Sequence, residues 1–312
     1  MHVAQAAPPF SGTIFLDPDI ITESDSTTYQ SIIDTGRGDR WMFDRRVNDW
    51  VFLNAFLFEA HFDDGLEIEI QVNPEFGSAN AAMTEASKYA PIIGRLPTCL
   101  RRDVETVWIH QGVQPFGGGN NNLLIHTGQA DQYATDGILE ETLVHEASHT
   151  SLDADHAGAS GWLAAQAADP EFISTYARDN PNREDIAESF LLYLALKYRP
   201  GRISQSLSNT ISQTIPNRIA YFASQEFDFY PIVVPEPLSI IEFTYGSVSG
   251  VWLLRWTSGQ GKTYAVEVST NQITWDELVS GIPSQGTTTS LTQTNTEFPN
   301  RIFFKVGQLE QP

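Results

Sequence analysis

Two histidines and a glutamate in the segment HEASH, residues 145–149, have the types and the spacing that metal chemistry requires. A helix repeats every 3.6 residues, so His145 and His149 lie one turn apart and present two nitrogens to one ion. Glu146 is rotated from His145 by about 100° around the helix, from where its carboxylate reaches a water on the metal without binding the metal. The segment therefore predicts a metal-dependent hydrolysis with Glu146 as general base. The alternative is a surface helix whose histidines only bond to neighbouring groups.

A catalytic zinc site has three protein ligands and one open position, so a third ligand has to come from elsewhere in the chain. One candidate is Asp155, ten residues after His145. Its use requires the helix to turn sharply at Leu152, and such a turn favours glycine, which is absent before Gly158. Asp155 is therefore the reserve candidate.

The favoured candidate is Glu184, which lies in a second predicted helix that starts at Pro181. A carboxylate on a helix packed against the first one completes the site. Glu188 follows one turn later. Its carboxylate is suited to accept a hydrogen bond from the histidine ring nitrogen that does not bind the metal. The spacing predicts His145, His149 and Glu184 as the three ligands.

The first 230 residues must position these side chains, and their patterns mix both element types. Apolar periodicity predicts helices at 79–96, 138–152, 160–168 and 183–198, and strands at 66–73, 104–113 and 122–128. The fold class is therefore α+β. The last of these strands, NLLIHTG, is predicted to be an exposed edge that pairs with an extended peptide, with His126 in a structural role.

HEASH and the later run YARDNPNREDIAESF, residues 176–190, together resemble the zinc metallopeptidases of the gluzincin clan, in particular the branch typified by anthrax lethal factor. The resemblance implies a zincin-like metallopeptidase domain with one catalytic Zn²⁺ held by His145, His149 and Glu184. It also implies Glu146 as the base, Tyr176 as the residue that assists at the oxyanion, and a protein or peptide substrate. Residues 1–100 carry no such likeness.

A proline-rich segment, FYPIVVPEPLS, predicts the boundary between two domains, because neither a helix nor a central strand tolerates its three prolines. We expect an N-terminal tail at 1–10, a metallopeptidase domain at 11–230, a linker at 231–237 and a small all-β sandwich at 238–312. The last segment alternates strand-like runs with turn signals, Gly281 among them, and resembles fibronectin type III modules. Its tryptophans, Trp252, Trp256 and Trp275, are expected in the core, which leaves surface or glycan binding as the less favoured role.

The amino-acid composition limits the classes of molecule that this protein is expected to bind. A net charge of −21 without a basic cluster excludes nucleic acid and anionic membrane surfaces as favoured partners, and no apolar run is long enough to span a membrane. Cys99 is the single cysteine, so no disulfide forms within the chain. Ala4, Gln5 and Ala6 have the A-x-A pattern of a signal-peptide cleavage site without a hydrophobic h-region, and this pattern favours a secreted protein. Two functions follow: a secreted zinc endopeptidase, or a secreted binding or adhesion protein whose metal site is structural or vestigial.

Overall fold

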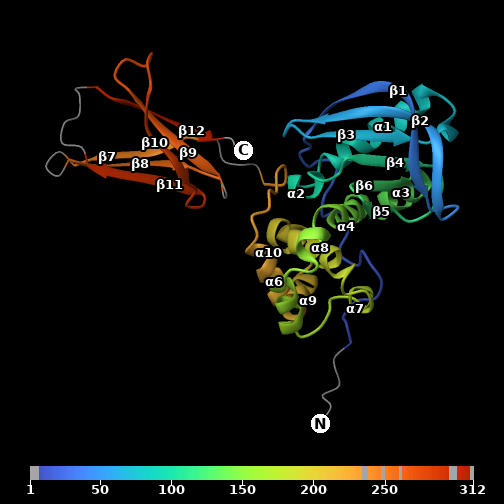
Figure 1. Ribbon diagram of the computed structural model, residues 1–312. Helices are drawn as coiled ribbons and strands as arrows, with labels where there is room; N and C mark the ends of the chain where they lie inside the picture. The colour runs from blue at the N-terminus through green and yellow to red at the C-terminus, as the bar shows by residue number, and fades with distance from the viewer. Residues whose placement is uncertain (1–6, 234–237, 247–249, 260–261, 295–300, 310–312) are drawn as a thin grey trace, which may run out of the picture. The chain divides into compact units, whose positions relative to one another are not determined.

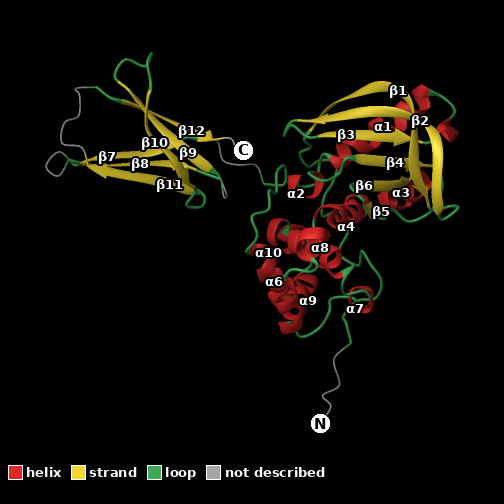
Figure 2. Cartoon of the chain, viewed as in Figure 1, coloured by secondary structure: helices red, strands yellow, loops and turns green. Residues whose placement is uncertain are grey.

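The computed structural model describes residues 7–233, 238–246, 250–259, 262–294 and 301–309. The chain divides into two units, residues 1–233 and 234–312, each described here by itself. The first unit mixes helices with strands, and the described part of the second contains strands alone (Figure 2). The predicted order of an α+β unit followed by an all-β unit is confirmed at this level. Residues 1–6 of the expected tail and 234–237 of the expected linker lie outside the described residues.

A six-stranded mixed sheet with the order β1-β2-β3-β4-β6-β5 forms the frame of the first unit (Figure 1). The strands β1 (Tyr29–Asp44) and β2 (Asp49–Phe62) form a long antiparallel hairpin that the sequence patterns did not predict. The strands β3 (Glu67–Val72), β4 (Thr106–His110) and β6 (Asn122–His126) are parallel to one another and lie within predicted segments.

One edge of this sheet is β1, and the other is β5 (Gly117–Gly119), which pairs antiparallel with β6. The prediction that residues 122–128 form an exposed edge is therefore wrong, because β6 lies between β4 and β5. His126 is fully buried, and its Nδ1 lies 2.9 Å from the carbonyl oxygen of Gln111, as its structural role requires.

Alternation along the strands gives the sheet two apolar faces. Leu123 and Ile125 of β6 point into the main core, which also contains α1 and α4, whereas Leu124 points to the opposite face. On that opposite face Leu124 meets Trp108 of β4 and Leu57 of β2 in a smaller cluster. We call it the hairpin face, because β1 and β2 supply most of its residues.

The helices of the first unit, with the two 3-10 helices, are η1 (Pro74–Phe76), α1 (Ala79–Ile93), α2 (Thr98–Arg101), α3 (Thr127–Thr135), α4 (Leu139–Ser151), α5 (Asp153–His156), α6 (Ser160–Ala168), α7 (Thr175–Asp179), α8 (Asp185–Tyr198), η2 (Pro200–Arg202), α9 (Gln205–Thr214) and α10 (Pro216–Ala223). Four of these helices, α1, α4, α6 and α8, lie within the predicted segments, and the short α5 follows directly after α4. The helices α2, α3, α7, α9 and α10 were not predicted, and α3 begins at Thr127, inside the segment 122–128 that was predicted as a strand. None of the helices in the described residues has the length and apolar character needed to cross a bilayer.

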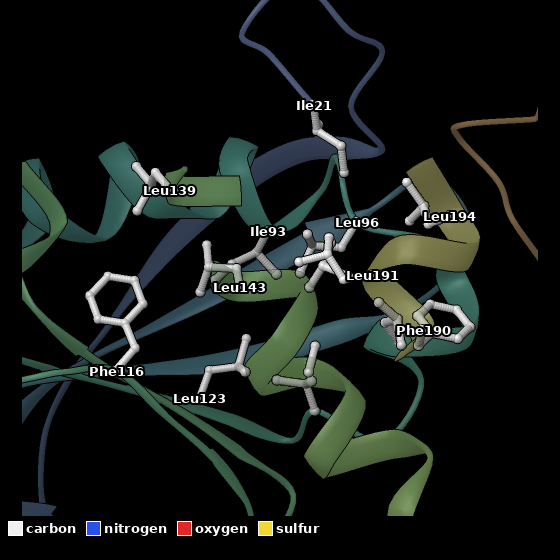
Figure 3. Packing of buried hydrophobic residues seen from close by; sticks show 14 of the residues in the cluster. Ile21, Ile93, Leu96, Phe116, Leu123, Leu139, Leu143, Phe190, Leu191 and Leu194 are labelled. Atoms are coloured by element: carbon white, nitrogen blue, oxygen red, sulfur yellow. The ribbon is translucent and has the colours of Figure 1, made fainter. Parts of the chain in front are cut away.

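The main core lies between the sheet and α4, α1 and α8. Figure 3 shows Leu139 and Leu143 of α4 among side chains from these elements, with Leu191 and Phe190 of α8 on one side. Residues before β1 also belong to this unit: Phe10 forms a parallel bridge with Ser174, and the backbone N–H of Ile21 donates to Glu141 Oε1 over 2.9 Å. The described end of the expected tail is therefore part of the fold.

The second unit consists of two three-stranded sheets with the orders β10-β9-β12 and β11-β8-β7. Their bounds are β7 (Ile240–Tyr245), β8 (Val251–Thr257), β9 (Thr263–Ser269), β10 (Asp276–Pro283), β11 (Thr288–Thr294) and β12 (Phe303–Leu309). Trp252 and Trp256 are buried in its core as predicted, and Trp275 is half-buried. Gly281 does not end a strand: it lies inside β10 with φ 71°, at an irregularity in the pairing with β9.

Candidate metal centre

The helix α4 carries HEASH on the main core. Glu140 and Glu141 lie in its first turn, and no Gly or Pro interrupts the segment from Leu139 to Ser151. Its apolar side chains pack inward, which fixes the direction in which His145 and His149 point. His145 is buried, and His149 is half-buried in the last turn.

Three atoms that could bind a metal ion converge beside this helix. His145 Nε2 and His149 Nε2 lie 3.2 Å apart, and Glu184 Oε2 lies 3.5 Å from the first and 3.3 Å from the second. A tetrahedral ion with bonds of about 2.0–2.2 Å keeps its ligand atoms about 3.3–3.6 Å apart. The structure thus brings together the three predicted ligands at a spacing that fits an ion of this geometry.

Glu184 is held in place by the start of α8. It occupies the N-cap position of that helix, one residue before the first helical residue, Asp185. The helix therefore begins four residues after the predicted start at Pro181 and two residues after the start of the predicted range 183–198. Asp185 is fully buried and accepts hydrogen bonds from Arg218 Nε and Gln166 Nε2, each over 2.9 Å. These bonds fix the backbone from which the Glu184 side chain reaches the histidines.

Asp153 orients the ring of His149. Its Oδ2 lies 2.8 Å from His149 Nδ1, so the Nδ1–H donates to the carboxylate and the lone pair stays on Nε2, which is the ligand atom. The sequence analysis did not identify Asp153. The available signal was its place four residues after His149, one turn further along the same face of the helix.

Glu188 is in an equivalent place for His145, at a longer distance. Its Oε1 lies 3.7 Å from His145 Nδ1, and its Oε2 accepts a hydrogen bond from Ser174 Oγ over 2.9 Å. Neither Glu188 Oε1 nor His145 Nδ1 has a hydrogen-bond partner among the described residues, although both atoms are buried.

The electrostatics of the site favour a positive charge at its centre. Burial acts to lower the pKa of His149, but the carboxylates of Asp153 and Glu184 outweigh it and raise the pKa to about 10. Burial acts to raise the pKa of Glu184, yet its contacts with His145 and His149 hold that pKa well below the usual range. The group therefore attracts a proton or a metal cation, and a metal that binds displaces the proton.

Glu146 and Tyr176 lie at the periphery of the ligand group. The half-buried Glu146 carboxylate has no hydrogen-bond or ion-pair partner in the described part of the chain, and it helps to raise the pKa of His149. Tyr176 of α7 is 39% exposed, and its hydroxyl donates to Glu184 Oε1 over 3.0 Å. Burial and Glu184 raise the pKa of Tyr176 to about 12, so the hydroxyl keeps its proton at neutral pH.

Asp155, the reserve candidate, points elsewhere. It is exposed on α5, and its Oδ2 lies 3.3 Å from Arg102 Nη2 in an ion pair at the surface. The helix α4 does end before Leu152, but Leu152 has φ −119° and ψ −32°, so no left-handed turn redirects the chain toward the ligands. The neighbouring His156 contacts the Tyr221 hydroxyl over 2.7 Å.

The glycines of β5 allow α4 to pass close to the sheet edge. A Cβ atom on Gly118 would lie 1.8 Å from the main-chain oxygen of Glu146. This distance is far shorter than a van der Waals contact, so only glycine fits at this position. The backbone N–H of Gly119 donates to Thr150 Oγ1 of the same helix over 2.8 Å. The sheet edge and the metal-ligand helix are therefore directly in contact.

Comparison with known proteins adds no relative: no family model matches the sequence, and no curated protein matches it. Functional assignment of this site therefore depends on its own geometry.

Proposed function

We propose that this protein is a zinc-dependent endopeptidase of the gluzincin type, secreted, with a zincin-like catalytic domain and a fibronectin-like accessory β-domain. One observation carries the proposal: the convergence of His145 Nε2, His149 Nε2 and Glu184 Oε2 within 3.2–3.5 Å of one another. Two imidazoles and one carboxylate are a donor set typical of catalytic zinc, which leaves a fourth position open.

His145, His149 and Glu184 would hold a zinc ion, which would polarise a peptide carbonyl and lower the pKa of a water molecule to about 7. Glu146 then accepts the proton of the attacking water, since its carboxylate is unpaired and next to the ligands. The same carboxyl group delivers that proton to the amine nitrogen that leaves. Asp153 keeps the His149 ring in the tautomer that binds the ion.

Tyr176 has two roles open to it. Its hydroxyl donates to Glu184 Oε1, which positions that ligand. The side chain is partly exposed and able to turn toward a substrate, where the hydroxyl would donate to the developing oxyanion. Donation in the transition state raises turnover, whereas positioning of Glu184 acts through metal affinity, so the two roles are separable by measurement.

The test is zinc content combined with peptide cleavage. The purified protein is expected to hold one zinc per chain, to cleave an unstructured protein such as casein, and to lose that activity on chelation. Glu146→Gln keeps the side-chain size and the ligands but removes the base, so zinc is retained while cleavage is lost. Zinc binding without cleavage by the unaltered protein would favour the alternative, a binding protein with a structural metal site.

A further inference from the structure

The strand β5 offers a place for an extended peptide beside the metal ligands. It is the outermost strand of the sheet, so one row of its peptide groups faces away from β6. Gly118 is exposed, and no side chain of Gly117–Gly119 obstructs that edge. Since α4 passes directly against Gly118, a peptide added to β5 as a further strand runs next to HEASH.

The two faces of β5 differ in what a substrate side chain would meet. Gly118 pairs with Leu123 and faces α4, whereas Gly117 pairs with Leu124 and faces the hairpin face. Side chains of a paired strand follow the same alternation. The substrate residue next to Gly117 therefore points to the hairpin face, away from α4.

Arg45 lies at that position on the hairpin face. It belongs to the turn between β1 and β2, and a Cβ atom on Gly117 would lie 3.0 Å from its Nη2 and 3.5 Å from its Nε. Arg45 and Glu146 both act on Tyr133 of α3: burial and Glu146 raise the pKa of the Tyr133 hydroxyl, and Arg45 lowers it. The guanidinium is therefore beside the sheet edge at Gly117.

Arg45 differs from the other arginines of the hairpin in having no partner. Arg40 pairs with Glu69 over 2.8 Å, Arg46 pairs with Asp44 over 2.7 Å, and Arg37 lies over the ring of Phe56. Arg45 is exposed and forms no hydrogen bond or ion pair with any residue that the structure describes. The Arg45 guanidinium at the β5 edge is therefore available to an acidic ligand.

We propose that Arg45 makes this protein select peptides that present a carboxylate at the residue paired with Gly117, an inference that rests on the proposed peptidase function. The carboxylate belongs either to an internal Glu or Asp side chain or to the C-terminus of the peptide. Arg45 provides the matching charge and two parallel N–H donors. The rest of this acidic protein repels such a peptide, so the preference is local to one substrate position.

The experiment compares cleavage rates of peptides that carry Glu, Gln or Lys at each position around the cleaved bond, with free or amidated C-termini. At one position, Glu or a terminal carboxylate is expected to raise kcat/KM about tenfold over its neutral counterpart, as one charge-assisted hydrogen bond allows. Arg45→Ala should remove this preference, and Arg45→Glu should reverse it in favour of Lys. Because Arg45 is exposed and unpaired within the described residues, neither change should unfold the protein.

The matched control is Arg301→Ala, which removes an exposed arginine of the second unit with no partner among the described residues. It should leave the preference unchanged. A preference for carboxylates that survives in Arg45→Ala, or no such preference in the unaltered protein, would overturn the proposal while leaving the peptidase function intact. If the zinc-loaded protein cleaves none of the peptides, the proposed function fails and this proposal with it.

Discussion

Substitution of Glu184 and substitution of Asp155 should affect zinc affinity to very different degrees. Glu184→Ala removes a ligand atom that lies 3.3–3.5 Å from the two histidine nitrogens, and we expect zinc binding to weaken by more than about 100-fold. Asp155→Ala removes a surface ion pair with Arg102 and should change affinity by less than about twofold. Competition with a chromophoric chelator measures both constants. Equal losses for the two variants would mean that the ligand set is different.

The Tyr176 hydroxyl allows its two roles to be separated. If it donates to the oxyanion, Tyr176→Phe lowers kcat by about 10- to 1000-fold and leaves KM and zinc affinity nearly unchanged. If it only positions Glu184, the same change weakens zinc binding and leaves the turnover of the fully loaded enzyme intact. Kinetics at saturating zinc, together with a zinc titration, distinguish these results. If Tyr176→Phe changes neither kcat nor zinc affinity, Tyr176 is a packing residue.

At the scale of elements, the close contact between β5 and α4 depends on Gly118, which has no side chain. Gly118→Ala places a methyl group 1.8 Å from the Glu146 oxygen, so helix or strand has to move. We expect a loss of about 1–3 kcal/mol in unfolding free energy, with weaker zinc binding because Glu146 and the ligands share this helix. Chemical denaturation measures the first effect. Gly158→Ala is the control, since a Cβ there meets nothing within 4 Å; equal stability of the two variants would contradict the close approach.

The first turn of α4 predicts a dependence of stability on pH. Burial raises the pKa of Glu141 to about 7, although the Ile21 N–H donates to its Oε1. The folded state therefore holds this proton more tightly than the unfolded state, and the unfolding free energy decreases as pH rises from about 4.5 to 7. Glu141→Gln should remove this decrease. The unfolding free energy of the variant should therefore rise relative to that of the unaltered protein as the pH increases across this range. Parallel curves for the two proteins, measured by denaturation at several pH values, would show that Glu141 titrates normally.

Periodicity predicted the elements that carry the ligands, because α4 and α8 have continuous apolar faces that pack on one core. The same reasoning missed β5, whose three glycines have no apolar pattern and become a strand only through pairing with β6 and contact with α4. It also missed the hairpin β1–β2, in which long-range pairing rather than local pattern decides the structure and many residues stay exposed. Asp153 was overlooked because an acidic residue after a helix usually has no partner.

At the scale of the whole molecule, the first unit should fold and bind zinc without the second. Phe229 is buried and its ring centroid lies 4.1 Å from that of Tyr198, while the Tyr230 carbonyl oxygen accepts a hydrogen bond from the Thr98 N–H. A chain that ends after Val233 keeps these contacts, whereas one that ends at Phe229 loses the second. The shorter protein, residues 1–233, should show cooperative unfolding and one zinc per chain. Its recovery only as aggregate would mean that the first unit needs residues beyond Val233.

The ligands come from two separate elements, and this has a consequence for the lifetime of the protein. His145 and His149 lie on α4, and Glu184 lies at the start of α8, so an ion bound by all three would act as a cross-link between distant parts of the chain. Above the dissociation constant, each tenfold rise in free zinc adds about 1.4 kcal/mol to the unfolding free energy. Resistance to heat and to digestion by other proteases would then follow the zinc content of the surroundings, and zinc-poor conditions would limit how long the molecule survives.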